Sequence, residues 1–156
     1  MNFSPLARGS AFKDVGHNAK SIQKEGAVVK AILFVDDHEV LARLSCEILE
    51  MQGYKAVSAY SAKEALEKFD QQDFDILVTD FRMEGMNGVE LAHKIREKSP
   101  STPVIIVTGY GPVDGGKDVA ACLQKEDLFP ALLDKIRFFL GDGSGVRENE
   151  PIAANS

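Results

Sequence analysis

The chain has 156 residues, of which 44% are hydrophobic and 27% are charged, and this fits one folded domain of ordinary size with some loosely structured sequence at its ends. Its formal net charge of -6 argues against a nucleic-acid partner, because binding to a phosphate backbone relies on clustered lysine and arginine. The two cysteines form no CxxC motif and no apolar run approaches the length of a membrane span, so we expect a cytoplasmic protein with free thiols and no membrane segment.

The two ends of the chain differ in composition from its middle. Residues 1–28 are rich in serine, glycine, asparagine and lysine and show no sustained hydrophobic period, which predicts a flexible leader with at most one short helix over residues 11–24. Residues 141–156 are glycine-rich and polar, which predicts a disordered tail. We therefore expect the folded domain to cover residues 29–140.

Five short apolar runs within this domain predict β-strands. The first four are rich in β-branched and aromatic residues, and their near-continuous apolarity predicts strands that are buried on both faces. The fifth run is a weaker signal. The predicted strands cover residues 30–35, 54–59, 74–79, 103–107 and 120–123.

Helical patterns lie between the first three strands. Residues 38–52 carry apolar side chains at helical spacing and stop before Gly53, a residue that commonly ends helices. Ser61 and Glu64 have the spacing of a capping box, in which each side chain satisfies a free backbone N–H group of the first turn. This pair predicts a second helix over residues 62–70.

Two more helices are predicted in the second half of the domain. Asn87 and Glu90 resemble the same capping device and open a helix that runs to residue 98. Asp127 is predicted to cap the last helix, where Pro130 is tolerated because it falls in the first turn. The repeated alternation of strand and helix predicts an α/β fold with a doubly wound, five-stranded parallel sheet.

Polar side chains follow four of the predicted strands, at the edge where ligands of such sheets collect. Taken singly, each has an ordinary structural explanation, and Asp37 has the position of a helix cap. Taken together, three carboxylates at one edge repel one another unless cations compensate them, and an all-oxygen site with several carboxylates suits Mg²⁺. The residues are Asp36, Asp37, Asp80, Thr108 and Lys125.

These motifs resemble those of bacterial two-component response-regulator receiver domains. The resemblance lies in the segments FVDDHEVL, VTDFRMEGMNGVEL, VIIVTGYG and CLQKED, and it covers about residues 29–140. It implies a flavodoxin-like fold with strand order 2-1-3-4-5. It also implies a protein that catalyses only its own phosphorylation and dephosphorylation and passes the signal to a downstream protein, which the sequence does not name.

The resemblance assigns roles to individual residues. Asp80 is implied as the nucleophile that takes a phosphoryl group from a sensor histidine kinase or a phosphotransfer protein. Thr108 and Lys125 are implied to bind the phosphoryl oxygens. The implied Mg²⁺ ligands are Asp37, Asp80 and the backbone carbonyl of Arg82, with Asp36 acting through the ion's hydration shell.

The chain also departs from the receiver pattern in ways that affect its output. Cys122 stands where the family usually has an aromatic residue, and Glu126 replaces the proline that usually follows the lysine. Only seventeen positions separate Thr108 from Lys125, and residues 111–116 are poor helix formers, so we expect a shortened or missing fourth helix. Signal readout is therefore not expected to follow the usual route.

Other functions fit the sequence less well. A receiver-fold module that signals without phosphorylation is favoured by Cys122 and the short fourth-helix region, and opposed by the intact set of site residues. A haloacid dehalogenase-type hydrolase needs a second acid where Arg82 stands. An electron carrier of the flavodoxin type needs a phosphate-binding loop where Asp36 and Asp37 would repel a phosphate.

Five further side chains are expected to have minor roles. Arg82 and Tyr110 lie two positions past Asp80 and Thr108, where they would edge the site and restrict attacking water. His93 is expected to be an ordinary helix-surface residue, and both cysteines are expected to be small buried fillers.

Overall fold

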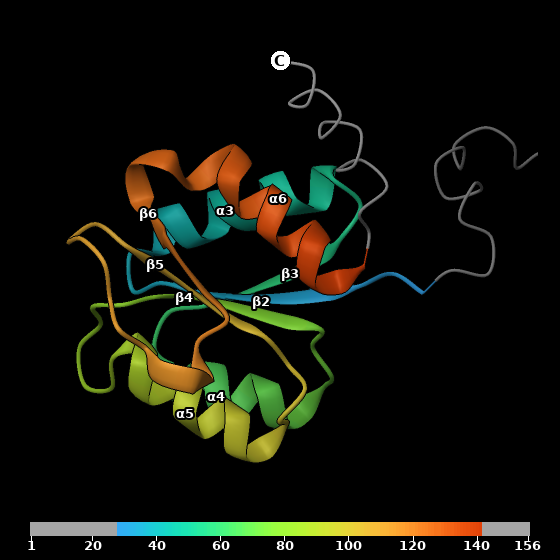
Figure 1. Ribbon diagram of the computed structural model, residues 1–156. Coiled ribbons are helices and arrows are strands. Elements are labelled where there is room, and N and C mark those ends of the chain that lie inside the picture. Colours follow the sequence, from blue (N-terminus) through green and yellow to red (C-terminus); the bar gives the residue numbers. More distant parts are fainter. Residues whose placement is uncertain (1–27, 142–156) are drawn as a thin grey trace, which may run out of the picture.

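Five parallel strands form the central sheet of the computed structural model, which describes residues 28–141 (Figure 1). Their spatial order is β3-β2-β4-β5-β6, which is the order 2-1-3-4-5 when the strands are counted along the chain, so the predicted sheet is confirmed. The predictions of a flexible leader and a disordered tail concern residues that lie almost entirely outside the described part. The strands are β2 (Ala31–Val35), β3 (Lys55–Ala59), β4 (Ile76–Asp80), β5 (Val104–Thr108) and β6 (Ala121–Gln124).

Helices cover both faces of the sheet (Figure 1). On one face lie α3 (Glu39–Met51) and α6 (Leu128–Leu140), and on the other lie α4 (Ala62–Gln71) and α5 (Gly88–Lys98). Each helix is too short or too polar to cross a bilayer, a statement that covers residues 28–141. The chain between β5 and β6 contains one 3₁₀ turn, η1 (Gly116–Asp118), and a second 3₁₀ turn, η2 (Lys125–Asp127), follows β6.

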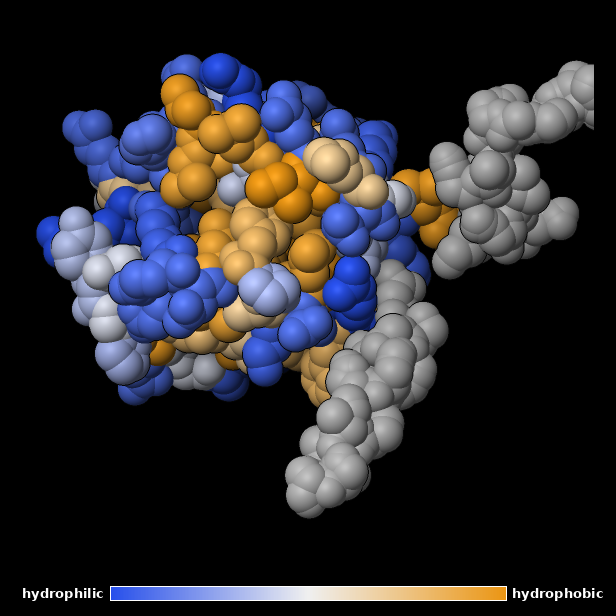
Figure 2. Space-filling view, turned by 90° about the horizontal axis from the view of Figure 1, so that it is seen from above, coloured by the Kyte–Doolittle hydropathy of each residue, from blue (hydrophilic) through white to orange (hydrophobic). Residues whose placement is uncertain are grey.

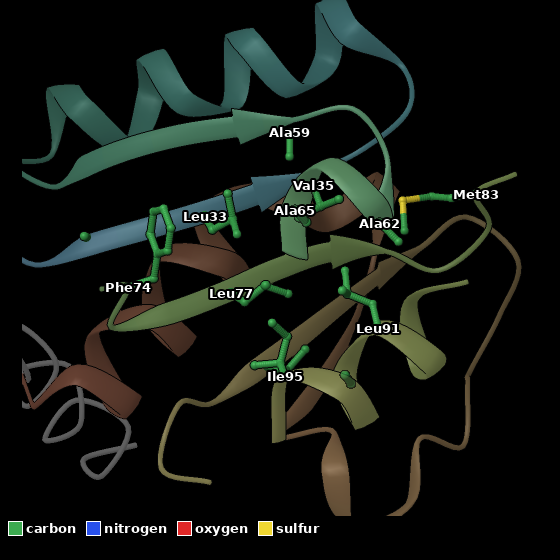
Figure 3. Packing of buried hydrophobic residues seen from close by; sticks show 13 residues of the cluster. Leu33, Val35, Ala59, Ala62, Ala65, Phe74, Leu77, Met83, Leu91 and Ile95 are labelled. Carbon is green, nitrogen blue, oxygen red and sulfur yellow. The ribbon is translucent and has the colours of Figure 1, made fainter. Parts of the chain in front are cut away.

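The hydrophobic core consists of two layers, one on each side of the sheet. Alternate residues of β2 enter different layers, with Leu33 in the layer against α4 and α5 and Phe34 in the layer against α3 and α6. Figure 3 shows the first layer, in which Leu33, Leu77 and Ile95 pack between strand and helix. Strands β2, β4 and β5 are buried along their whole length, as predicted.

The prediction of burial on both faces is wrong for β3. Only its last residue, Ala59, is buried, and Lys55 is exposed. The reason is topological, because β3 lies at the edge of the sheet and pairs with β2 alone. An apolar run does not reveal whether its strand has one neighbour or two.

Both predicted capping devices are present, but only one is complete. The side chain of Asn87 accepts hydrogen bonds from the first turn of α5, and the Glu90 carboxylate accepts one from the Asn87 N–H group. Ser61 accepts from the N–H group of Glu64 at 3.0 Å, yet the Glu64 carboxylate accepts from the N–H group of Tyr60 instead of that of Ser61. The α4 cap therefore extends one residue further back than predicted.

The prediction that Asp127 caps the last helix is wrong. Its side chain makes no capping hydrogen bond, and Phe129 leaves helical geometry with φ -110° and ψ 134°. The residue before a proline is sterically disfavoured in the α conformation, so Pro130 forces Phe129 into an extended conformation. The regular part of α6 accordingly begins at Pro130, and the Phe129–Pro130 peptide bond is cis.

Candidate functional site

Three carboxylates lie together where β2 and β4 end. Asp36 and Asp37 directly follow β2, and Asp80 is the last residue of the neighbouring strand β4, whose Thr79 pairs with Val35. One carboxylate oxygen from each of the three aspartates lies within 4.8 Å of the others. Asp36 and Asp80 are buried and Asp37 is exposed, so the cluster has one side open to solvent.

Lys125 lies between the two buried carboxylates. Its Nζ is 3.2 Å from Oδ2 of Asp36 and 3.2 Å from Oδ1 of Asp80. The lysine begins η2 immediately after β6, and its aliphatic chain passes Gly109, where an added Cβ would lie 3.9 Å from its Cδ. The outermost strand β6 thus delivers a cation to acids from β2 and β4.

The electrostatics of the cluster leave it short of positive charge. The pKa of Asp80 is raised, first by burial and then by the charge of Asp36, and Lys125 only partly offsets these effects. Burial acts to lower the pKa of Lys125, but the charges of Asp36 and Asp80 outweigh it and the pKa is raised. The cluster holds three carboxylates and Lys125 pairs with two of them, so a further cation would stabilise it.

Both oxygens of Asp36 already have donors. Oδ2 faces Lys125, and Oδ1 accepts the N–H group of His38 at 2.9 Å. His38 also caps α3, since its Nδ1 accepts the N–H group of Leu41 at 3.3 Å, so the cap that the sequence placed at Asp37 belongs to His38. This leaves Asp37 and the second oxygen of Asp80 as the carboxylate groups with room for a ligand.

Thr108 ends β5 beside Asp80, as the pairing of Asp80 with Val107 requires. It is fully buried, and its Oγ1 accepts the N–H group of Tyr110 at 3.0 Å. The guanidinium carbon of Arg82 lies 4.4 Å from the centre of the Tyr110 ring, a cation–π contact. The sequence placed Arg82 and Tyr110 at the edge of the site, but their contact with each other was not predicted.

An open hollow of about 490 Å³ adjoins the acidic cluster. Arg82 and Asp37 both line it, so the residue whose carbonyl was assigned to the metal lies beside one of the assigned carboxylates. The other lining residues come from the loop after β4 and are Phe81, Met83, Glu84, Gly85 and Asn87.

The chemistry of these donors fits Mg²⁺. All of them are oxygen atoms, at least two are carboxylates with free coordination positions, and the hollow leaves room for the waters that Mg²⁺ retains. Nitrogen and sulfur ligands, which would favour zinc, are absent from this cluster within residues 28–141.

Gly88 is a supporting residue that the sequence patterns did not single out. A Cβ added to it would lie 2.5 Å from the backbone oxygen of Asp80, and its own N–H group donates to the Phe81 carbonyl at 2.9 Å. Only glycine therefore lets α5 begin so close to the end of β4. The signal in the sequence is the Asn87-Gly88 pair, where a glycine directly follows the capping residue.

The two cysteines lie away from the acidic cluster. Cys46 is buried in α3, and burial followed by the charge of Glu50 raises the pKa of its thiol to about 11, so it is an inert core residue. Cys122 on β6 is only partly buried, so the expectation of a buried filler is wrong for it. Its strand is at the sheet edge, where one neighbour is missing.

Comparison with known proteins finds relatives among response regulators and sensor proteins. FleR, a response regulator protein of Pseudomonas aeruginosa, is 33% identical over 128 residues, which are 78% of this chain and 27% of FleR. The sensor protein EvgS of Escherichia coli is 32% identical over 111 residues, 70% of this chain and 9% of EvgS. The chain therefore spans a small part of these two relatives.

Solved structures match the chain over nearly their whole length. The response regulator TrrA of Thermotoga maritima, crystallised with Mg²⁺ and BeF, has a TM-score of 0.67 and 30% identity and covers 71% of this chain and 99% of its own. A CheY-like receiver domain protein of Methanospirillum hungatei has a TM-score of 0.64 and 28% identity, with 74% and 100% covered.

The chain also matches a known protein family over most of its described residues. Residues 32–126 match the response regulator receiver domain family, a range that runs from β2 to the residue after Lys125 and includes all three carboxylates. Sequence, strand order and the acidic cluster agree, and the chain belongs to the response regulator receiver domain family.

Proposed function

We propose that this chain is a phosphoacceptor, in which Asp80 takes a phosphoryl group from a sensor histidine kinase or a phosphotransfer protein. The observation that carries the proposal is the pairing of Asp80 with Lys125 at 3.2 Å beside two further carboxylates. Two solved complexes of a similar protein support it, since TrrA was crystallised with Mg²⁺ and BeF and also with the histidine kinase ThkA.

Each group of the site has a task in this transfer. An oxygen of Asp80 attacks the phosphorus, the new P–O bond forms as the P–N bond to the donor histidine breaks, and the imidazole leaves with the electron pair. The Lys125 ammonium binds the negatively charged phosphoryl oxygens once they arrive, and the Thr108 hydroxyl donates to a phosphoryl oxygen. Mg²⁺ would neutralise charge on the reacting oxygens. Its ligands would be Asp37, Asp80 and the Arg82 carbonyl, with Asp36 acting through a water.

Charge balance favours Lys125 as a mobile cation in this scheme. In the resting protein it is held by Asp36 and Asp80 together. A phosphoryl group on Asp80 removes one of these carboxylates and offers new anionic oxygens nearby, so the ammonium has a stronger partner without leaving the site. The reaction needs no other catalytic group, so the chain would catalyse only its own phosphorylation and the hydrolysis that reverses it.

The output side of the domain departs from the family, and we infer that its fourth helix is reduced to the turn η1. Residues 109–120 carry no longer helix between β5 and β6, and the partly buried Cys122 replaces the aromatic residue of the family. These observations favour a second candidate function, a receiver-fold interaction module that signals without phosphorylation. Under either function we propose a cytoplasmic domain over residues 29–140 whose downstream partner is a protein.

The deciding experiment treats the purified full chain with acetyl phosphate and Mg²⁺ and measures the intact mass. We expect one added phosphoryl group in the wild type and in Asp73→Asn, a control that removes an exposed carboxylate just before β4. Asp80→Asn should give no adduct, and Lys125→Ala should form it more than about tenfold more slowly, because a charge-assisted hydrogen bond contributes about 1.5–3 kcal/mol.

A folded wild-type protein that never gains the mass would contradict the phosphoacceptor proposal and leave the interaction module. An adduct of equal yield in Asp80→Asn would show that the phosphoryl group is carried elsewhere. Circular dichroism on each variant separates loss of chemistry from loss of fold.

A further inference from the structure

Two groups of side chains depart from the rule that apolar residues are buried and polar residues are exposed. The first lies on the surface, where Figure 2 shows apolar side chains gathered on the face formed by α3 and α6, with hydrophilic ones around them. The second lies inside the part of the chain that the structure describes. Its buried polar residues are Asp36, Ser45, Thr79, Asp80, Thr102 and Thr108. Among these, Thr79 directly precedes the proposed phosphoacceptor Asp80 but has no task in the proposed transfer.

Thr79 occupies a position in the sheet that suits an apolar side chain. It pairs with Val35 of β2 on one side and with Ile106 of β5 on the other, and all three residues are fully buried. Alternation along β4 directs the Thr79 side chain to the same face as Leu77, toward the layer against α4 and α5. Valine has nearly the same shape as threonine but lacks the hydroxyl, whose burial costs free energy unless it forms a hydrogen bond. The hydroxyl therefore needs an explanation other than packing.

The Thr79 hydroxyl contacts both ends of the segment that follows β4. Its Oγ1 donates to the backbone carbonyl oxygen of Asp80 at 2.9 Å and lies 4.0 Å from Sδ of Met83. The Met83 side chain is buried, and Figure 3 shows it among the other residues of this core layer. One hydroxyl thus connects the residue that ends β4 with a buried side chain three positions later.

The segment between these two contacts carries a proposed Mg²⁺ ligand, the backbone carbonyl of Arg82. On its N-terminal side, Phe81 donates its N–H group to the Val107 carbonyl at 3.0 Å and accepts the N–H group of Gly88 at 2.9 Å. On its C-terminal side, the buried side chain of Met83 holds the backbone against the core. The direction of the Arg82 carbonyl is therefore set by the contacts of its two neighbours in the chain.

We propose that Thr79 is a positioning residue of the Mg²⁺ site, an inference that rests on the proposed phosphoacceptor function. By contacting the Asp80 carbonyl and the Met83 sulfur, its hydroxyl keeps residues 81–83 in one conformation and so prepares the Arg82 carbonyl to bind the ion. Residues that hold metal ligands in place without binding the metal typically change metal affinity by about 10–100-fold when they are replaced. Loss of the Thr79 hydroxyl should therefore weaken Mg²⁺ binding.

A Mg²⁺ titration of the purified full chain, followed by NMR of its backbone amides, tests this role. Thr79→Val keeps the shape of the side chain and removes the hydroxyl, so its dissociation constant for Mg²⁺ should rise about tenfold. Thr79→Ala removes the hydroxyl with a different change in volume and should show the same loss. Thr79→Ser keeps a hydroxyl and should bind Mg²⁺ within about threefold of the wild type.

Thr102→Val is the matched control. Thr102 is also buried, and its Oγ1 lies 2.8 Å from Oγ of Ser99, but it precedes β5 and so lies at the amino end of the sheet, opposite the acidic cluster. This variant should bind Mg²⁺ like the wild type. Hydrogen exchange without Mg²⁺ gives a second readout, in which residues 81–83 should exchange about threefold faster or more in Thr79→Val and at the wild-type rate in Thr102→Val.

The outcomes separate this inference from the function on which it rests. Equal Mg²⁺ affinity in the wild type and in Thr79→Val would overturn the role of Thr79 and leave the phosphoacceptor function in place. Equal losses in Thr79→Val and Thr79→Ser, or in Thr102→Val, would also overturn it, because the hydroxyl of Thr79 would not be the cause. A wild type that neither binds Mg²⁺ nor takes a phosphoryl group would overturn both proposals. Cooperative thermal melting of each variant shows that a weaker affinity is not caused by unfolding.

Discussion

At the scale of single residues, the site is organised by a shortage of positive charge. Lys125 contacts two buried carboxylates at once, and the pKa of Asp80 stays raised, chiefly through burial, despite this contact. A site that already holds more negative charge than its lysine can neutralise is a poor binding place for a free anion. It becomes a good one only when a divalent cation and Lys125 act together.

Tyr110 is expected to set how long a phosphoryl group survives. The ring and Arg82 form an exposed cation–π pair between the loops that follow β5 and β4, worth about 0.5–1 kcal/mol. If the pair limits access of water to the phosphoryl group, the phosphorylated Tyr110→Ala variant should lose this group about two- to fivefold faster than the wild type after acetyl phosphate is removed. The factor is the free energy of the contact converted to a rate, because 1.4 kcal/mol corresponds to a tenfold change. The measurement is the decay of the phosphorylated mass with time.

Phe138→Ala is the matched control for this experiment. Phe138 on α6 has the same exposed fraction as Tyr110, 71%, but it lies outside the phosphoryl site. Its removal should leave the lifetime unchanged. Equal acceleration in both variants would mean that loss of an aromatic ring, and not its contact with Arg82, causes the effect.

At the scale of secondary-structure elements, the junction between β4 and α5 is the tightest backbone approach near the site. Gly88→Ala would place a Cβ 2.5 Å from the Asp80 carbonyl oxygen and 3.1 Å from the Phe81 Cα, and neither backbone atom can move freely. We expect a loss of about 1–3 kcal/mol in the free energy of unfolding, measured by urea titration.

Gly109→Ala is the comparison for this junction. An added Cβ there would have an ordinary contact of 3.9 Å with Cδ of Lys125, so the change in unfolding free energy should stay within about 0.5 kcal/mol. Similar losses in both variants would point to a general cost of replacing glycine and would remove the special role of Gly88.

The turn η1 is tied to α5 through a titratable side chain. Nδ1 of His93 lies 3.0 Å from Oδ2 of Asp118, and its Nε2 lies 3.1 Å from Oε2 of Glu97. The hydrogen bond with Asp118 and then the charge of Glu97 raise the pKa of His93. His93 is thus a surface residue, as expected, but one that links two elements.

This link should make stability depend on pH. Because the folded pKa of His93 lies above its unfolded value of about 6.5, the stabilisation is fully present below that pH and disappears as the pH rises through the folded pKa. The melting temperature of the wild type, relative to His93→Gln, should therefore fall as the pH rises above about 6.5. The effect should be small because the pair is exposed, and a flat difference curve would contradict it.

At the scale of the whole molecule, Mg²⁺ should stabilise the fold, since it would bind a cluster that exists only when β2 and β4 are paired. A ligand that binds only the native state, at a concentration ten times its dissociation constant, raises the free energy of unfolding by about 1.4 kcal/mol. For a domain of this size, this corresponds to a rise of about 4 °C in melting temperature. Thermal unfolding with and without Mg²⁺ measures it.

The source of this shift can be located with two exposed aspartates. Asp37→Asn removes a carboxylate of the cluster and should abolish most of the Mg²⁺ shift, whereas Asp73→Asn changes the charge equally and should keep it. A shift of the same size in both variants would place the stabilising ion elsewhere on this acidic protein.

The sequence by itself determined the elements and the three carboxylates that lie together at the edge of the sheet. The apolar runs, the stops at Gly53 and the caps at Ser61 and Asn87 are local signals, so strand and helix positions followed to within two residues. Parallel strands bring their carboxyl ends to one edge, and for this reason the order of residues along the chain was enough to place Asp36, Asp37 and Asp80 together.

Only the tertiary structure decided how these parts meet. The partial exposure of β3 and Cys122 depends on which strands are outermost, and the contacts of Lys125 with Asp36, of Arg82 with Tyr110 and of His93 with Asp118 join residues from different elements. The position of a residue in the chain fixes its own backbone preferences but not the distance to a side chain on another element. That distance is set by packing, and here packing gives the acidic cluster its charge balance.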